Sequence, residues 1–366
     1  MGNEEETMDK LEQARNIIRE ADKEMAALFE KRMHAARMVA EYKIEHGLPV
    51  YDAAQEARVI ERNTALIEDE TLKDFYVEYI QNTMAVSRSM QHRIMEGMRV
   101  AYSGVEGAFA HIAARNLFPD GKHISLPSFE AAYEAVVKGE CDCAVLPIEN
   151  SYTGEVGQVV DMMFSGSLYV NGIYDLPITQ HLLGCPGATM TDITQVVSHP
   201  QALAQCHAYI QKKGYREITA ENTALAAKRV AEAGDIHTAA IASLETAQLY
   251  GLQVLDHDIH ESKTNTTRFA IFARSENKPA VTAGHTFILM FTVKHQAGEL
   301  AKAISVIGRY GFNMKVLRSR PMKTLPWQYY FYAEAEGDED GAAAKFMLNE
   351  LSEHCAMLKV VGCYKA

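Results

Sequence analysis

The sequence predicts a multidomain protein in which an all-helical segment precedes an α/β segment and a small terminal α+β segment. Residues 8–46 carry apolar residues at helical spacing, with no glycine or proline before Gly47 and Pro49. From Met98 onward, short apolar runs alternate with helical patterns. At 366 residues, the chain exceeds the size at which a single hydrophobic core stops growing, so two or three domains are expected.

The first segment, residues 1–97, is predicted to be entirely helical. One long helix covers residues 8–46, and shorter helical patterns cover about 52–68 and 71–95. Three helices of such unequal length rarely bury a core alone. Pairing with a second copy of the chain is therefore expected.

The second segment, residues 98–275, is predicted to be an α/β domain with largely parallel strands. Its strand-like runs are MRVAY, CAVLPI, VVSH, TAAIAS and RFAIFA, and its helical patterns cover 107–117, 128–138, 201–213 and 222–233. A polar linker at 276–284 follows. Residues 285–366 then give the order strand, helix, strand, strand, helix, strand, which is the ferredoxin-like βαββαβ arrangement.

Composition excludes several classes of protein. The net charge is −12 and no basic block stands out, so no nucleic-acid partner is expected. No apolar run approaches the roughly 20 residues that span a bilayer, and the acidic N-terminus is unlike a targeting signal. The six cysteines lack metal-ligand spacing, so we expect reduced thiols, no metal site and a cytoplasmic location.

Two cations share an apolar stripe on the first predicted helix. Leu28, Arg32, Val39 and Lys43 fall within about 60° on a helical wheel. Their long side chains could snorkel to water, or they could form an anion site on a buried face. Arg15 is turned roughly 100° away from that stripe, so it could serve a partner's pocket rather than its own.

Two polar pairs at i, i+4 spacing fall on the later helices. Asp52 with Glu56, and Ser87 with Gln91, each present polar groups on one helical face. Asp52 could instead cap its helix, and the other side chains could lie on solvated faces.

Four polar clusters adjoin strand-like runs in the α/β segment. Because ligands bind at the carboxyl ends of parallel strands, one pocket could gather all four clusters. In isolation each could equally form turns, helix caps or packed side chains. None has the spacing of a dinucleotide fingerprint, so a nicotinamide cofactor is not expected. The clusters are SGVEGAFA at 103–110, PIENSYTG at 147–154, SHPQALAQC at 198–206 and NTTRF at 265–269.

The helical segment resembles the all-helical chorismate mutases, which are intertwined dimers that convert chorismate to prephenate. The resemblance implies that arginines hold two carboxylates, while Lys43 and Gln91 donate to the ether oxygen. The remaining polar groups would orient the ring. One place departs from the family pattern, because Gln55 stands where the family usually has arginine, and Arg58 could compensate. The matching positions are Arg15 (from the partner), Arg32, Lys43, Asp52, Glu56, Ser87 and Gln91.

Residues 98–275 resemble prephenate dehydratase in the glycine loop, PIENS, SHPQ, ENTALAA, LYGLQVL and NTTRF. The resemblance implies two α/β lobes of the periplasmic-binding-protein kind around a cleft. It makes Thr267 the proton donor, with a relay through Glu149 as an alternative, and makes Arg268 the carboxylate ligand. Ala108 and Ala110 stand where the family often has hydroxyl residues. Further hydrogen bonds to substrate would come from Asn150, Ser198, Gln201 and Thr223.

Residues 285–366 resemble an ACT domain, a ligand-sensing unit, in QAGEL, GFNM, SRP and PW. Glu299 and Arg318 depart from the family at both effector loops, which could be a compensating charge swap or could change effector binding. A dimerisation module without a ligand is the alternative. The effector-binding residues implied are Gly298, Glu299, Leu300, Asn313, Arg318, Ser319, Arg320 and Pro321.

Together these resemblances imply a bifunctional enzyme of phenylalanine biosynthesis. It would convert chorismate to prephenate and then to phenylpyruvate, under feedback by L-phenylalanine. A homodimer or homotetramer without cofactor, metal, nucleic-acid or membrane partner is expected. The alternative is a non-catalytic amino-acid-sensing binding protein with a helical dimerisation domain.

Overall fold

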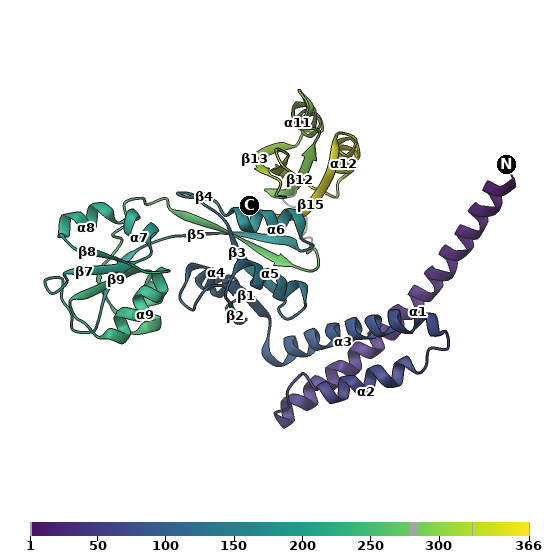
Figure 1. Cartoon of the computed structure of the whole chain (residues 1–366), viewed down its shortest axis with the longest axis horizontal. Coiled ribbons are helices and arrows are strands. Elements are labelled where there is room, and N and C mark those ends of the chain that lie inside the picture. The colour runs from purple at the N-terminus through teal and green to yellow at the C-terminus, as the bar shows by residue number, and fades with distance from the viewer. Residues whose placement is uncertain (1, 278–283, 324, 366) are drawn as a thin grey trace. The chain divides into compact units, whose positions relative to one another are not determined.

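The computed structural model describes residues 2–277, 284–323 and 325–365. It divides into two compact units, a helical unit at Met1–Arg99 and a second unit at Val100–Ala366 (Figure 1). The linker predicted at 276–284 falls largely on 278–283, which lie outside the described residues. The division of the second unit at that linker stays a prediction. In the described part of the chain, no helix is long and apolar enough to cross a membrane.

The helical unit contains the three predicted helices. They are α1 (Gly2–His46), α2 (Ala53–Thr64) and α3 (Lys73–Glu96), with a short 3₁₀ turn, η1 (Glu70–Leu72), before α3. The C-terminal part of α1 packs on α3, and α1 extends well past α3 at its N-terminal end (Figure 1). Asp52 caps α2 by accepting a hydrogen bond from the Gln55 N–H at 3.0 Å, so the capping interpretation is confirmed.

The apolar stripe expected on α1 is only partly buried within one chain. Leu28 and Val39 are 63% and 45% exposed, whereas Ala36 and Ala40 are buried. The expectation of a buried stripe is therefore wrong for the isolated chain. The physical reason is that, among the described side chains of α1, the other helices of the same chain bury only those in its C-terminal third, from Arg32 onward.

The second unit contains two sheets, and the prediction of largely parallel strands is wrong. In the larger sheet β1 and β3 are parallel, but β11 lies antiparallel between β3 and β5. In the smaller sheet β7 is parallel to β8 and β9, whereas β6 and β10 are antiparallel to their neighbours. Because the chain passes to the second sheet and returns as β11, this strand enters the first sheet from the opposite direction.

The larger sheet has the order β13-β14-β12-β15-β5-β11-β3-β1-β2, with β4 beside β3, and the smaller has β10-β6-β9-β7-β8. We call β1–β5 and β11 with α4–α6 the first lobe, and β6–β10 with α7–α10 the second lobe. The bounds of the first lobe are β1 Arg99–Ser103, α4 Phe109–Leu117, β2 Lys122–Leu126, α5 Phe129–Val137, β3 Cys143–Asn150, β4 Gly154–Glu155, α6 Gly157–Ser165, β5 Tyr169–Pro177 and β11 Thr266–Ala273.

The second lobe follows the predicted alternation, except that the helix predicted at 201–213 is broken at Cys206 into two. The sequence interpretation did not assign β2, β5, β6, β8 and β10. The bounds are β6 His181–Gly184, β7 Gln195–Ser198, α7 Pro200–Gln205, α8 His207–Lys213, β8 Arg216–Thr219, α9 Thr223–Ala233, β9 Thr238–Ala242, α10 Leu244–Tyr250 and β10 Gln253–Asp256.

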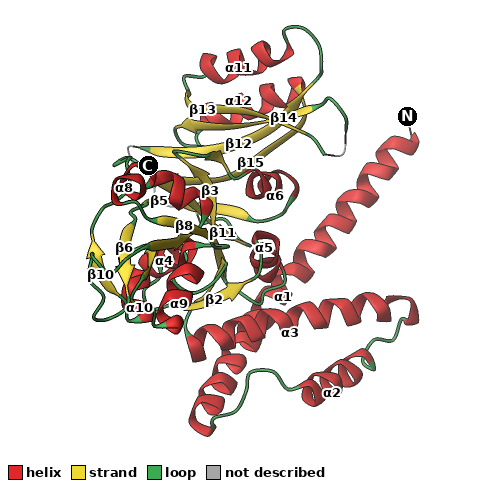
Figure 2. Cartoon of the chain, turned by 60° about the vertical axis from the view of Figure 1, so that its left-hand side comes forward, coloured by secondary structure: helices red, strands yellow, loops and turns green. Residues whose placement is uncertain are grey.

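The C-terminal segment, residues 285–365, has the predicted order of strand, helix, strand, strand, helix, strand. Both helices lie on one face of its four strands (Figure 2). Its sheet joins the first lobe where Gly362 pairs with Val170, and a Cβ at Gly362 would lie 2.1 Å from the Val170 carbonyl oxygen. Glycine is therefore required at this close approach. The bounds are β12 His285–Val293, α11 Glu299–Arg309, β13 Asn313–Pro321, β14 Tyr329–Glu336, α12 Ala342–His354 and β15 Cys355–Lys365.

Candidate functional sites

A cavity of about 160 Å³ lies among the three helices of the helical unit. Six of the seven residues predicted for this site line it. Arg15 does not line it and lies exposed on α1, roughly 25 Å along the helix axis from Arg32. The lining residues are Arg32, Val39, Lys43, Val50, Asp52, Gln55, Glu56, Val59, Met84, Ser87, Arg88 and Gln91.

The two cations of α1 are held by groups on the neighbouring segments. Arg32 Nη1 donates to Ser87 Oγ and to the Thr83 carbonyl oxygen at 3.2 Å. Lys43 Nζ donates to the Val50 carbonyl oxygen at 2.6 Å and to Gln91 Oε1 at 3.3 Å. Burial lowers the pKa of Arg32, but a guanidinium stays charged at neutral pH. The cavity therefore presents two fixed positive charges to a ligand.

One charged residue of this cavity was missed by the sequence analysis. Arg88 lines the cavity and forms an ion pair with Glu56. Its only sequence signal was its place beside Ser87. Arg58, expected to compensate for Gln55, donates instead to Gln55 Oε1 at 2.9 and 3.2 Å and does not line the cavity. Arg88, rather than Arg58, supplies the additional cation.

A second cavity, of about 360 Å³, lies between the two lobes. We call it the interlobe cavity. Of the predicted residues, Asn150, Gln201, Thr223 and Thr267 line it, together with Ala108 and Ala110. Glu221 and His199 also line the cavity and were not predicted as site residues. Nothing in the sequence pointed to Glu221, and His199 was interpreted as a packed side chain. Other lining residues are Phe109, Phe129, Pro147, Thr153, Val156, Ile178, Gln180, Ala202, Gln205, Asn222 and Phe269.

Thr267 and Asn150 are cross-strand neighbours at the mouth of the first lobe. Asn150 Nδ2 donates to Thr267 Oγ1 and to Asn265 Oδ1, both at 2.9 Å. Asn150 Oδ1 accepts from the backbone N–H groups of Tyr152 and Thr153 at 3.0 Å, which fixes the orientation of the amide. Within the described part of the chain, the Thr267 hydroxyl accepts a hydrogen bond but has no acceptor for its own hydrogen. That hydrogen is available to a ligand in the cavity.

Three other predicted residues do not reach the interlobe cavity. Successive side chains of a strand point to opposite faces, so Arg268 and Glu149 face away from the cavity that Thr267 and Asn150 line. Ser198 is completely buried and donates to the Ile241 carbonyl oxygen at 2.6 Å. The expectations of a carboxylate ligand at Arg268, a relay at Glu149 and a substrate contact at Ser198 are not met by this geometry.

Arg268 and Glu149 are instead engaged by the C-terminal segment. Arg268 Nη1 lies 3.1 Å from Glu334 Oε1, and its Nε lies 3.3 Å from Asp175 Oδ1. Glu149 forms an ion pair with Arg318. Burial opposes the charge of Arg268, but the combined attraction of Glu334, Tyr364 and Asp175 outweighs it and raises the pKa of the guanidinium above its usual value.

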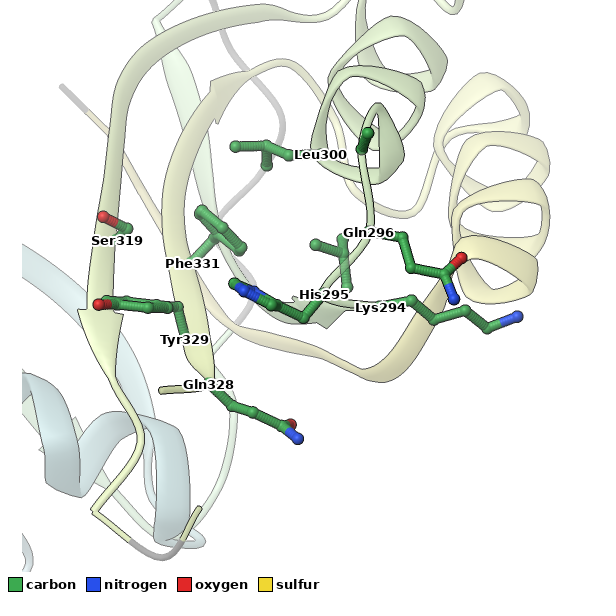
Figure 3. Close-up of a pocket in the computed structure, with 10 residues that line it drawn as sticks. Lys294, His295, Gln296, Leu300, Ser319, Gln328, Tyr329 and Phe331 are labelled. Carbon is green, nitrogen blue, oxygen red and sulfur yellow. The ribbon is translucent and has the colours of Figure 1, made fainter. Parts of the chain in front are cut away.

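A third cavity, of about 480 Å³, lies in the C-terminal segment, and we call it the C-terminal pocket (Figure 3). Leu300 and Ser319 are the two predicted effector residues that line it. His295, Gln296, Gln328, Tyr329 and Phe331 were not predicted. The remaining lining residues are Val293, Lys294 and Ala297.

The other predicted effector residues do not line this pocket. Glu299 pairs with Lys302 at 2.7 Å and Arg318 pairs with Glu149, so the two residues do not pair with each other within one chain, and a compensating charge swap between the loops stays a prediction. Asn313 donates to Glu336 Oε2 at 2.7 Å. Gly298 precedes α11, Arg320 pairs with Glu155 and Asp161, and Pro321 ends β13.

One buried group in the described residues could hold a metal ion. His285, Glu339 and Cys363 bring their ligand atoms within 4.8 Å of one another. His285 Nε2 and Glu339 Oε2 already lie 2.9 Å apart as a hydrogen-bonded pair. The group lies in the C-terminal segment and belongs to none of the three cavities.

Comparison with known proteins defines the class of this chain. Residues 14–92 match the family model described as chorismate mutase type II, and residues 100–277 match that of prephenate dehydratase. The chain therefore carries a mutase domain followed by a dehydratase domain. The bifunctional chorismate mutase/prephenate dehydratase of Aquifex aeolicus is 30% identical over 98% of each chain. The chain belongs to the bifunctional chorismate mutase/prephenate dehydratase family.

Two solved structures are similar to the second unit and its fold. The prephenate dehydratase of Arthrobacter aurescens in complex with L-Phe has a TM-score of 0.67 and 26% identity, covering 74% of this chain and 90% of that one. A protein named GqqA, described as a novel type of quorum quenching acylase, has a TM-score of 0.68 and 30% identity. That match covers 73% of this chain and 98% of that one.

Proposed function

We propose that the helical unit converts chorismate to prephenate and that the interlobe cavity converts prephenate to phenylpyruvate, in phenylalanine biosynthesis. The observation that carries the proposal is the Thr267–Asn150 pair. Asn150 donates to the Thr267 hydroxyl, which lines the interlobe cavity beside amide and hydroxyl side chains and keeps its own hydrogen for a ligand. The two reactions are consecutive, so they account for both domains in one chain.

The mutase reaction needs a compact substrate conformation and stabilisation of charge on the breaking ether oxygen, and it needs no nucleophile. Arg32 and Arg88 hold the substrate carboxylates in this proposal, with Arg15 supplied by a second copy of the chain. Lys43 Nζ uses two of its three hydrogens on Val50 and Gln91, which leaves one for the ether oxygen. Asp52, Glu56 and Ser87 orient the ring.

The dehydratase reaction breaks two bonds of prephenate. The ring carboxylate leaves as carbon dioxide, and its bonding electrons complete the aromatic ring as the ring hydroxyl departs. Thr267 donates the proton that turns the departing hydroxyl into water. An alcohol is a weak acid, so this transfer occurs late in the cleavage, when the leaving oxygen has become basic. The threonine regains a proton from solvent before the next turnover.

The substrate carboxylates need partners other than Arg268. The residues that line the described interlobe cavity include no lysine or arginine. The N-terminal ends of α4 and α9 border it at Phe109 and Thr223, and the first backbone N–H groups of a helix have no partner within the helix. His199 Nδ1 accepts from the Gln201 N–H at 3.2 Å, so its other nitrogen can donate to an anion. We assign carboxylate binding to these groups.

We further propose that the C-terminal segment is an ACT domain that binds L-phenylalanine in the C-terminal pocket. The bound L-Phe named for the Arthrobacter protein supports this ligand. The pocket combines an apolar wall of Leu300, Val293 and Phe331 with polar groups at Ser319 and Gln328, which suits an aromatic amino acid.

We propose a homodimer or homotetramer. Long apolar side chains on α1, such as Ile17, Ile18 and Leu28, are 58–68% exposed, and a hollow lined by Met25 and Phe29 lies between α1 and α3. Such a surface suits a second α1. Sedimentation of the purified chain as a monomer would contradict this. No disulfide links the six cysteines, all of which lie in described residues; this fits a reducing cytoplasm, which cell fractionation would test.

The proposal is tested by supplying chorismate, and separately prephenate, to the purified chain. We expect phenylpyruvate from both, detected by its ultraviolet absorbance. A non-catalytic amino-acid sensor, the alternative function, would bind L-phenylalanine but release no product above background. The acylase relative accounts for 73% of this chain, whereas the bifunctional Aquifex relative accounts for 98%. We therefore assign the reactions of the bifunctional family.

A further inference from the structure

The strands β13 and β14 have different neighbours on their two faces. Ser319 and Phe331 face the C-terminal pocket. The residues on either side of them face the first lobe instead, where Arg320 Nε lies 3.0 Å from Asp161 Oδ1 and Tyr330 donates to the same oxygen at 2.6 Å. One pair of strands therefore contacts both the pocket and the catalytic lobe.

Glu334 is the most deeply buried charge on that second face. It is 1% exposed, and its carboxylate accepts hydrogen bonds from three elements. Arg268 Nη1 on β11 donates at 3.1 and 3.3 Å, and the hydroxyls of Tyr332 and Tyr364 each donate at 2.6 Å. A buried charge with three fixed partners holds its cation in one geometry, because moving the cation away would leave the carboxylate uncompensated.

Arg268 and Glu149 are directly opposite each other on β11 and β3. Each nevertheless takes its partner from the C-terminal segment, Arg268 from β14 and Glu149 from β13. Thr267 precedes Arg268 on β11, and Asn150 follows Glu149 on β3, so the Thr267–Asn150 pair lies on the opposite face. The C-terminal segment therefore forms ion pairs with both strands at the residues adjacent to this pair.

The backbone ladder is irregular at this point. The register between β11 and β3 shifts between Arg268 and Phe269. On its other edge β11 pairs with β5 without a register shift from Thr266 to Ala270. The ladder with β5 therefore holds the backbone of β11, and the side-chain anchor at Arg268 supports the irregular edge that faces β3.

We infer that Glu334 is a positioning residue for the dehydratase reaction, acting through Arg268 to hold β11 so that the Thr267 hydroxyl points at the substrate. The inference rests on the proposed function, since it needs Thr267 to be the donor. Displacement of a reacting group by about 1 Å can cost roughly 100-fold in rate. Substitution of Glu334 should therefore lower kcat of the dehydratase reaction and leave the KM for prephenate nearly unchanged.

The test uses the full chain with Glu334→Gln, Arg268→Gln and the double variant. Glutamine keeps the size of the side chain and one acceptor oxygen and removes the charge. Its NH2 group replaces the second oxygen, so one of the two tyrosine hydroxyls must accept a hydrogen bond instead of donating one. We expect Glu334→Gln to lower the dehydratase kcat by at least about five-fold with KM for prephenate within about two-fold. The double variant should turn over no more slowly than Arg268→Gln. Glu336→Gln, two residues along the same strand with its surface partner Lys315, is the matched control and should leave kcat unchanged.

A loss of less than about five-fold in Glu334→Gln, or losses that multiply in the double variant, would overturn the inference. If Glu334→Gln does not fold, Tyr364→Phe removes one hydrogen bond to Glu334 with only the small loss of volume of one oxygen atom. Tyr364→Phe should then lower kcat alone, and an unchanged kcat would count against the inference. Thr267→Val is measured in parallel. If that variant stays active, the proposed donor is wrong, whereas an inactive Thr267→Val beside an active Glu334→Gln refutes only the role of Glu334.

Discussion

Replacement of Thr267 by valine separates catalysis from stability at the interlobe cavity. Valine keeps the shape of threonine and removes its hydroxyl. The variant loses the hydrogen bond from Asn150 Nδ2, but that nitrogen keeps Asn265 Oδ1 at 2.9 Å and the Thr266 carbonyl oxygen at 3.3 Å. Because Asn150 Nδ2 keeps these hydrogen-bond partners, we expect the free energy of unfolding to fall by only about 0.5–1 kcal/mol.

The loss of a proton donor is much larger. General acid catalysis contributes roughly 10²- to 10⁴-fold, which corresponds to about 3–5 kcal/mol of transition-state stabilisation. Formation of phenylpyruvate from prephenate should fall by that factor, while the mutase rate of the same sample stays constant. Thr266→Val is the control, because Thr266 is outside the cavity lining and its hydroxyl donates to the Thr264 carbonyl oxygen at 3.3 Å.

The reasoning would be refuted if Thr267→Val kept more than about a tenth of the dehydratase activity, since that exceeds what loss of a general acid allows. Equal losses in Thr266→Val and Thr267→Val would also refute it, by showing that the strand rather than the hydroxyl is disturbed. Melting curves for both variants supply the stability comparison.

Three further predictions concern the other sites. Lys43→Met should lower the mutase kcat about 10²- to 10³-fold, measured by chorismate consumption, and leave dehydration of supplied prephenate unchanged. Leu300→Ala should weaken L-phenylalanine binding roughly ten-fold by calorimetric titration, because it removes apolar contact area from the C-terminal pocket. Burial lowers the pKa of His111, whose Nδ1 accepts from the Gly107 N–H at 3.0 Å. Its stabilising effect is therefore present above the unfolded pKa of about 6.5 and lost as the pH falls through the folded value, so His111→Gln should flatten the acid dependence of the melting temperature.

The sequence placed most of the polar residues that line the two proposed catalytic cavities. Asn150 and Thr267 meet because each adjoins an apolar run that becomes a strand of the same sheet. Lys43 and Gln91 meet because helical spacing puts each on the packed face of its own helix. Arg88 escaped prediction because an arginine on a helix is usually solvated, and only the packing of α2 against α3 gives it Glu56 as a partner.

The sequence by itself determined the order of the segments, most of the helices and the four polar clusters, because these depend on local periodicity and residue chemistry. Only the tertiary structure decided the direction of β11 and the faces on which Arg268 and Glu149 lie. A shift of one residue moves a strand side chain to the opposite face, and nothing local records which face meets a cavity. The C-terminal segment, more than 60 residues beyond Arg268 at Glu334, supplies the carboxylate that binds it.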